Sequence, residues 1–210
     1  IEGVVVSDGV TVTTTDAQGI YQMRVKRNAP FVFVSVPAEY EIPVENGMPK
    51  IYKKIAMGDN DVVQRSFKLE RTGKKKRFTL LALADVQIGR DDEVTMLDNE
   101  VLPFLIPYVQ QELEVPVYGI SLGDLVWDNM PFHEVYKQRI RKIGVPVFQV
   151  IGNHDHNKAI TVDADADASF EAAFGPTYYS YNIGDCHFIV LDDVLYTGSS
   201  SYTADITDEQ

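Results

Sequence analysis

The segment Gly152-Asn153-His154-Asp155 places an amide and an imidazole side by side. Residues 145–151 form an apolar run immediately before it, which predicts a buried strand that ends at this point. From the end of that strand, Asn153 can offer an oxygen ligand and His154 a ring nitrogen to the same site. These residue types at this spacing therefore indicate a site that can hold a metal ion.

Two other apolar runs end in a similar way. Residues 80–84 lead into Asp85-Val86-Gln87, and residues 117–122 lead into Gly123-Asp124. Side chains two apart on an extended chain point to the same face, so Asp85 and Gln87 can share one ligand. Because open α/β sheets bind ligands at the carboxyl ends of their strands, the three strand ends predict one shared site.

Together the three segments resemble the calcineurin-like metallophosphoesterases. The pattern of that family runs D-x-H, then G-D-x-x, then G-N-H-D or G-N-H-E, followed by two later histidine motifs. The resemblance spans residues 78–210 and is imperfect in the first segment, where Gln87 replaces the commoner His. It implies hydrolysis of phosphate esters by water activated between two divalent metal ions, which are Mn, Fe, Zn or Mg.

The resemblance also implies a role for each metal ligand. Asp85 and Gln87 would bind the first ion, Asp124 would bridge both ions, and Asn153 would bind the second. A neutral amide oxygen at Gln87 favours Mn, Mg or Fe over zinc. Structural roles remain open, since Asp85 and Asp124 can cap loops or helices and Asn153 can hold a turn. Gln87 can bind metal through its amide oxygen or lie beside the site.

Two residues are predicted to be catalytic. The resemblance implies that His154 contacts the phosphoryl group or protonates the leaving oxygen. We expect Asp155 to support His154 through a hydrogen bond, which is common beside metal sites. A purely structural role for His154 is the alternative.

Other residues near these segments are candidates for contacting the substrate. Asp128 and Asn129 can line the mouth of the site, although either can instead cap a helix before Pro131. His156 can contact substrate or lie on the surface of a loop. For the remaining polar residues we expect structural roles: a solvated His133, a structural His187 in a buried strand, a buried thiol at Cys186, packing by Trp127, and a solvated loop at Asp163, Asp165 and Asp167.

The composition limits the classes of partner. The chain has 210 residues and a net charge of −12, which disfavours nucleic-acid binding through phosphate contacts. Bound divalent ions can still make an acidic protein attractive to a small phosphorylated substrate. No apolar stretch approaches the roughly 18 residues of a membrane span. A single cysteine excludes an intramolecular disulfide within the chain.

The chain is expected to contain two structural parts. Residues 1–70 show short strand-like runs separated by turns, which predict a small all-β sandwich that folds separately. The segment Thr15-Asp16-x-x-Gly19-x-Tyr21 resembles carboxypeptidase-regulatory-like domains. Residues 71–77 form a basic linker, and residues 78–210 alternate strands with helices, which predicts an incomplete α/β domain with mixed, layered sheets. The expected strands cover residues 4–6, 10–14, 20–25, 31–36, 62–69, 80–84, 117–122, 145–151, 178–183 and 187–191, and the expected helices cover 93–114 (interrupted by prolines), 134–143 and 169–174.

The order of the parts resembles exported bacterial phosphoesterases, which implies a periplasmic or extracellular location. The chain begins at Ile1 without Met, and Thr207 with Gln210 fits a helix-capping box at the other end. We therefore expect a fragment that ends inside the catalytic domain, lacks the later histidine ligands, is inactive alone and tends to self-associate, its missing C-terminal portion being its natural partner. The alternative is a non-catalytic module on the same scaffold that binds glycans or phosphorylated ligands.

Overall fold

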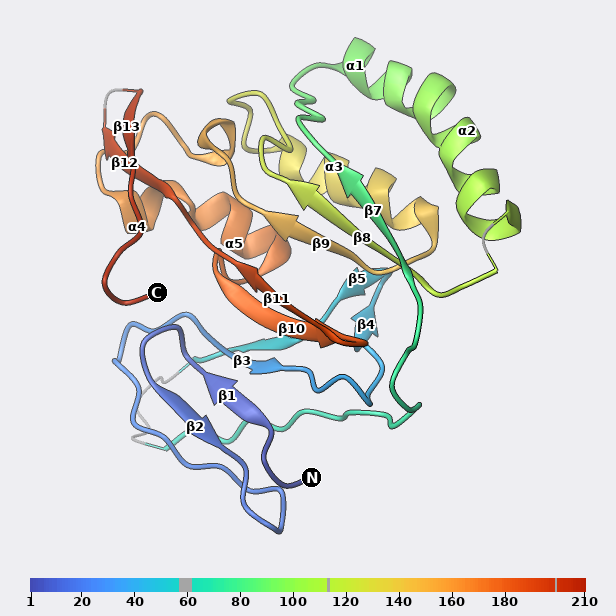
Figure 1. Ribbon diagram of the computed structural model, residues 1–210. Coiled ribbons are helices and arrows are strands. Elements are labelled where there is room, and N and C mark those ends of the chain that lie inside the picture. Colours follow the sequence, from blue (N-terminus) through green and yellow to red (C-terminus); the bar gives the residue numbers. More distant parts are fainter. Residues whose placement is uncertain (57–61, 113, 199) are drawn as a thin grey trace.

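A computed structural model describes residues 1–56, 62–112, 114–198 and 200–210 (Figure 1). In its N-terminal part a four-stranded antiparallel sheet has the order β2-β1-β3-β6. Its strands are β1 (Val5–Ser7), β2 (Val12–Thr14), β3 (Phe31–Ser35) and β6 (Tyr52–Lys54). A small separate hairpin joins β4 (Val44–Glu45) to β5 (Met48–Pro49).

Two turns near the N-terminus separate the short strand-like runs expected there. After β1, Asp8 Oδ1 accepts hydrogen bonds from the backbone N–H groups of Val10 (3.0 Å) and Thr11 (2.6 Å). In the second turn, Asp16 Oδ1 accepts from the N–H of Ile20 at 2.8 Å. Gly19 has φ +78° there, and a Cβ at this position would lie 2.5 Å from the Ile1 nitrogen. Turn chemistry thus accounts for this segment.

Residues 20–25 and 62–69 alternate between exposed and partly buried positions as predicted, but neither segment is a strand. Their inward side chains pack on the N-terminal core, and the Tyr21 hydroxyl donates to the Arg65 carbonyl at 2.8 Å. The alternation therefore reflects burial of one face without a backbone ladder. The two segments supply no second sheet, so the expected sandwich is not confirmed.

A parallel three-stranded sheet in the order β7-β8-β9 forms the centre of the second part. Its strands are β7 (Thr79–Leu83), β8 (Val117–Leu122) and β9 (Val147–Val150), which confirms the three predicted apolar strands. The sheet and its helices form the α/β arrangement that the alternating pattern predicts.

Helices pack on one side of this sheet around a shared apolar core. The first helical segment runs through α1 (Asp91–Met96), a π-helical turn (Leu97–Val101), α2 (Leu102–Pro107) and a second π-helical turn (Tyr108–Glu112). Proline lacks an N–H, and wider turns next to Pro103 and Pro107 accommodate this loss. The second, α3 (Phe132–Ile140), starts two residues before its predicted start and continues into a 3₁₀ turn, Arg141–Ile143.

The C-terminal segments only partly follow prediction. Helix α5 (Ala168–Phe174) and the hairpin of β10 (Tyr179–Ile183) with β11 (Cys186–Val190) are confirmed, whereas α4 (Asp163–Ala166) and the hairpin of β12 (Val194–Gly198) with β13 (Ser201–Ala204) were not predicted. The expected helix start at Thr207 is a turn instead. There the Gln210 side chain bonds the backbone N–H (2.9 Å) and C=O (2.8 Å) of Asp192.

One apolar core crosses the expected boundary near residue 70. Residues from both parts share this cluster: Val4, Val6, Val32, Val34, Val36, Ile42 and Ile51 from the first, and Tyr118, Ile120, Phe148, Tyr181, Ile183 and Val190 from the second. The backbone N–H and side-chain amide of Asn182 both donate to the Val36 carbonyl, at 3.1 and 2.9 Å. Residues 1–70 thus share a core with the second part, and their separate folding stays a prediction. Within the described residues, no helix combines the length and apolarity needed to cross a membrane.

Candidate functional site

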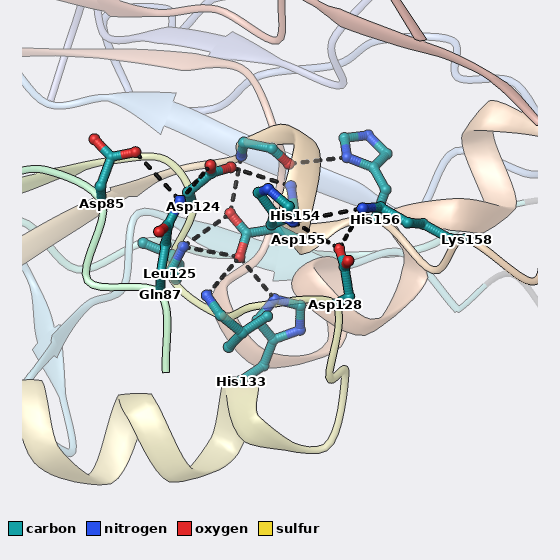
Figure 2. Close-up of polar contacts among 12 residues, drawn as sticks. Asp85, Gln87, Asp124, Leu125, Asp128, His133, His154, Asp155, His156 and Lys158 are labelled. Carbon is teal, nitrogen blue, oxygen red and sulfur yellow. Dashed lines mark hydrogen bonds and ion pairs between the residues drawn. The ribbon is translucent and has the colours of Figure 1, made fainter. Parts of the chain in front are cut away.

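The three predicted strand ends meet at the carboxyl edge of the parallel sheet (Figure 2). Gln87 Nε2 lies 2.9 Å from Asp124 Oδ2 and 3.4 Å from Asp85 Oδ1, so both carboxylates lie within reach of one amide group. The Gln87 backbone N–H also donates to the Asp124 carbonyl at 2.9 Å. The structure thus brings Asp85, Gln87 and Asp124 together.

A hollow of about 430 Å³ opens beside these residues. Asp85, Asp124 and Asn153 line it, and so does a further carboxylate, Asp193. The sequence interpretation did not include Asp193, although the residue follows soon after the apolar strand β11 and so repeats the strand-end pattern. Apolar side chains complete the wall, among them Leu122, Leu191 and Ile206.

The backbone of this site adopts an unusual conformation. Asp85 (φ 50°), Gln87 (φ 49°), Asp124 (φ 49°) and Asp128 (φ 53°) all occupy the left-handed region. Such a conformation is uncommon for residues other than glycine, costs free energy, and concentrates at functional sites. Four such residues on two adjacent loops indicate that the surrounding fold holds these side chains in place.

Asp155 joins the loop after β8 to the loop after β9. It is fully buried, and its carboxylate accepts from the backbone N–H groups of Leu125 (3.0 Å), Val126 (3.1 Å) and Gly152 (2.9 Å). The ring of His133 bonds the same carboxylate at 3.2 Å. The expected hydrogen bond from Asp155 to His154 is therefore wrong, since the carboxylate is occupied by other donors and serves the loop backbone.

His133 also departs from prediction. Its side chain is 1% exposed rather than solvated, and its two ring nitrogens bond Asp155 and Ser169. The long-range partner on another loop makes burial of this polar ring favourable, and a helix pattern alone does not reveal such a partner.

His154 is held by Asp128 instead. His154 Nδ1 lies 2.7 Å from Asp128 Oδ1, and Lys158 Nζ lies 2.6 Å from the same oxygen. Burial opposes ionisation of Asp128, but hydrogen bonds from Lys158 and His154 outweigh it and lower the pKa of this carboxyl. The backbone N–H of His154 donates to Asp124 Oδ1 at 3.0 Å, which ties the histidine to the predicted metal ligands. Neither Lys158 nor this pairing of Asp128 was anticipated from the sequence.

The other two candidates for contacting substrate, Asn129 and His156, bind backbone carbonyl groups of the protein. Asn129 Nδ2 donates to the Gly89 carbonyl at 2.7 Å and tethers two loops. His156 is 1% exposed, bonds the Gly152 carbonyl at 3.0 Å and stacks on Tyr196. A substrate contact by His156 is therefore wrong for this structure, because the ring is enclosed.

Four structural expectations elsewhere also need correction. Cys186 and His187 are exposed, because β11 is paired on one side only and is not a buried strand. Trp127 is 51% exposed and stacks on the His154 ring, with centroids 4.0 Å apart. Asp167 is buried rather than solvated, and burial, assisted by nearby acidic groups, raises the pKa of its carboxyl to about 8.

The donors at the strand ends suit a hard cation. Asp85 and Asp124 supply carboxylate oxygens, while Gln87 and Asn153 supply amide oxygens, the ligand types preferred by Mg, Ca and Mn. Gln87 turns its amide nitrogen toward the two carboxylates, so its amide group would have to turn over to offer oxygen to a cation held between them. Among the described residues, no group of three or more His, Cys, Asp or Glu side chains converges as a metal cluster. Two carboxylates and two amides are the donor types of a site for a hard cation.

Residues 1–72 match the family model described as N terminal of calcineurin-like phosphoesterase. The resemblance to the calcineurin-like metallophosphoesterase superfamily is confirmed. The match ends close to the predicted boundary at residue 70, and the division into domains remains a prediction.

One solved structure similar to this chain is a purple acid phosphatase isolated from yellow lupin (Lupinus luteus) seeds. It is 14% identical with a TM-score of 0.38, and the alignment covers 52% of this chain and 23% of the phosphatase. The chain thus spans about a quarter of that protein. No curated protein matches the chain.

Proposed function

We propose that this chain carries the first half of the active site of a metal-dependent phosphohydrolase. The observation that carries the proposal is the meeting of Asp85, Gln87 and Asp124 at one sheet edge, beside His154. The superfamily match supports hydrolysis of phosphate esters as the reaction class. The substrate is a phosphomonoester, a phosphodiester or a pyrophosphate.

Asp85, Gln87, Asp124 and Asn153 would hold the divalent ions in this proposal. When bound, such ions neutralise phosphoryl oxygens and lower the pKa of the attacking water. The oxygen-only donor set favours Mn, Mg or Fe over zinc at this half of the site.

His154 acts on the leaving group in this proposal. Asp128 holds Nδ1 of the ring, so Nε2 is the nitrogen left to meet a phosphoryl or leaving oxygen. Lys158 shares the Asp128 carboxylate and adds positive charge next to the ring. Asp155 takes no part in proton transfer, since it anchors the loops that carry Asp124 and His154.

The 210-residue chain by itself is proposed to be inactive. His133 and His156 are buried with partners of their own, and His187 lies on the β10–β11 hairpin bonded to Asn182, so none of them completes the ligand set. The order of the parts further supports a periplasmic or extracellular location, as in the exported bacterial enzymes that the sequence resembles.

The test is hydrolysis of p-nitrophenyl phosphate and bis-p-nitrophenyl phosphate by the full-length gene product, with and without Mn²⁺. Metal-dependent turnover that Asp124→Asn abolishes is the expected result. Binding of phosphate esters without turnover of either substrate would favour the non-catalytic binding module instead.

A further inference from the structure

Trp127 is the sole tryptophan of the chain, and it stands half exposed on the loop that follows β8. One face of its indole lies on the His154 ring, with centroids 4.0 Å apart and planes 18° apart. An exposed fraction of 51% with one face covered leaves the rest of the ring open to solvent. A large apolar side chain that is exposed beside a polar site is a candidate contact for a ligand.

Backbone contacts hold the loop that carries this indole. The backbone N–H of Trp127 donates to the Ile88 carbonyl at 3.1 Å, and the backbone N–H of the next residue, Asp128, donates to the His154 carbonyl at 3.2 Å. Gly89 packs so closely that a Cβ there would lie 2.9 Å from the Trp127 carbonyl oxygen. A preformed aromatic surface loses little conformational entropy when a ligand stacks on it.

We propose that Trp127 is the platform for the leaving group, and that the site prefers phosphate esters whose leaving group carries a planar unsaturated ring. This inference rests on the proposed function, because His154 must face the leaving oxygen for Trp127 to lie beside the group attached to it. A ring stacked on the indole gains an aromatic contact that a saturated ring of similar size does not make. An aryl group and a nucleobase share this chemistry.

Binding to the 210-residue chain in Mn²⁺ tests the preference, because binding avoids the effect of leaving-group acidity on rate. Phenyl phosphate and cyclohexyl phosphate have six ring carbons each and differ in planarity. By calorimetry we expect phenyl phosphate to bind about threefold to tenfold more tightly. Trp127 emission, excited at 295 nm, should change with phenyl phosphate and not with cyclohexyl phosphate. Adenosine 5′-monophosphate forms a further arm: tighter binding than phenyl phosphate assigns the platform to a nucleobase, and weaker binding assigns it to an aryl group.

Three variants make the ratio of the two affinities decisive. Trp127→Ala and Trp127→Leu should bring the ratio of phenyl to cyclohexyl affinity close to one, whereas Trp127→Phe should keep part of it. A general disturbance of His154 or of the loop would weaken both esters equally and leave the ratio unchanged. Equal affinities in the wild type, or a ratio that survives in Trp127→Leu, would overturn the platform. Inorganic phosphate distinguishes failure of the platform from failure of the proposed function. If it binds with Mn²⁺ while phenyl and cyclohexyl phosphate bind equally, only the platform is wrong. If no phosphate compound binds, the proposed function is wrong as well.

Discussion

Gly152 approaches Asp124 so closely that a Cβ at position 152 would lie 2.3 Å from both the backbone nitrogen and Oδ1 of Asp124. The backbone of Gly152 has φ −126°, which any residue can adopt. Glycine is therefore needed for space rather than for conformation, and it lets the loop after β9 pack against the loop after β8.

Replacing this glycine should separate the two loops. Gly152→Ala is expected to lower the free energy of unfolding by about 2 kcal/mol and to weaken Mn²⁺ binding, since the clash involves backbone and a proposed ligand. Chemical denaturation and calorimetry measure the two effects. Gly73→Ala is the control, because a Cβ there meets nothing within 4 Å and costs only the strain of φ +84°. Similar behaviour of the two variants would argue against the close approach.

We expect Asp155 to contribute to the stability of the fold and not to proton transfer in the reaction. Asp155→Ala leaves the N–H groups of Leu125, Val126 and Gly152 without their acceptor in a buried place, so we expect a loss of about 3 kcal/mol in the free energy of unfolding. The exposed Asp165→Ala should change stability by less than about 0.5 kcal/mol. Unchanged stability with lost turnover in Asp155→Ala would instead assign Asp155 the catalytic role first expected from the sequence.

The buried carboxyl of Asp167 predicts a pH dependence of stability. Burial, with added repulsion from Glu171 and Asp192, raises its pKa to about 8, and its Oδ1 has no hydrogen-bond partner among the described residues. The unfolded chain should titrate near the usual value of about 3.9. Between these values the folded chain binds more protons, so stability should fall as pH rises from about 4 to about 8.

Asp167→Asn mimics the neutral form and should reduce this fall, with a gain above about 1 kcal/mol at pH 8. The variant should remain sensitive to pH, because burial also raises the pKa of Glu171 to about 7. Thermal unfolding across the pH range measures the effect, and Asp165→Asn makes the same charge change at an exposed position. An unchanged pH profile in Asp167→Asn would show that Asp167 is ionised in the folded chain.

Gln87→His tests the choice of metal. Histidine tolerates the positive φ of this position better than most residues, and its ring nitrogen is a ligand that zinc favours. We expect Zn²⁺ to bind at least about tenfold more tightly to the variant, with little change for Mg²⁺. Gln110→His, away from the site, controls for the added imidazole. Equal zinc affinity in the wild type and Gln87→His would place Gln87 outside the metal site.

The sequence predicted the features that depend on short segments. Continuous apolar runs located β7, β8 and β9, because such a run needs no partner far away in the chain to be recognised. Burial of His133 and Asp155 escaped prediction, because each has its partner 22 residues away in the chain. Local patterns of apolar and polar residues carry no information on such partners.

Conformation and pairing at the site were also beyond sequence reasoning. The residue types of Gln87 and Asp124 do not predict a positive φ. The packing of two loops imposes this conformation. The segments 20–25 and 62–69 alternate as strands do, yet they form no ladder, since alternation reports which face is buried and not which backbone groups pair.

Calorimetric titration of the 210-residue chain with Mn²⁺, compared with Asp124→Asn, tests the central claim most directly. The claim predicts one saturable ion in the wild type, held weakly by an oxygen-only set, and binding at least about tenfold weaker in the variant, because one negative charge is removed from the ligands. Absence of Mn²⁺ binding to the wild type, or equal affinity in Asp124→Asn, would contradict the assignment of this sheet edge as the metal site.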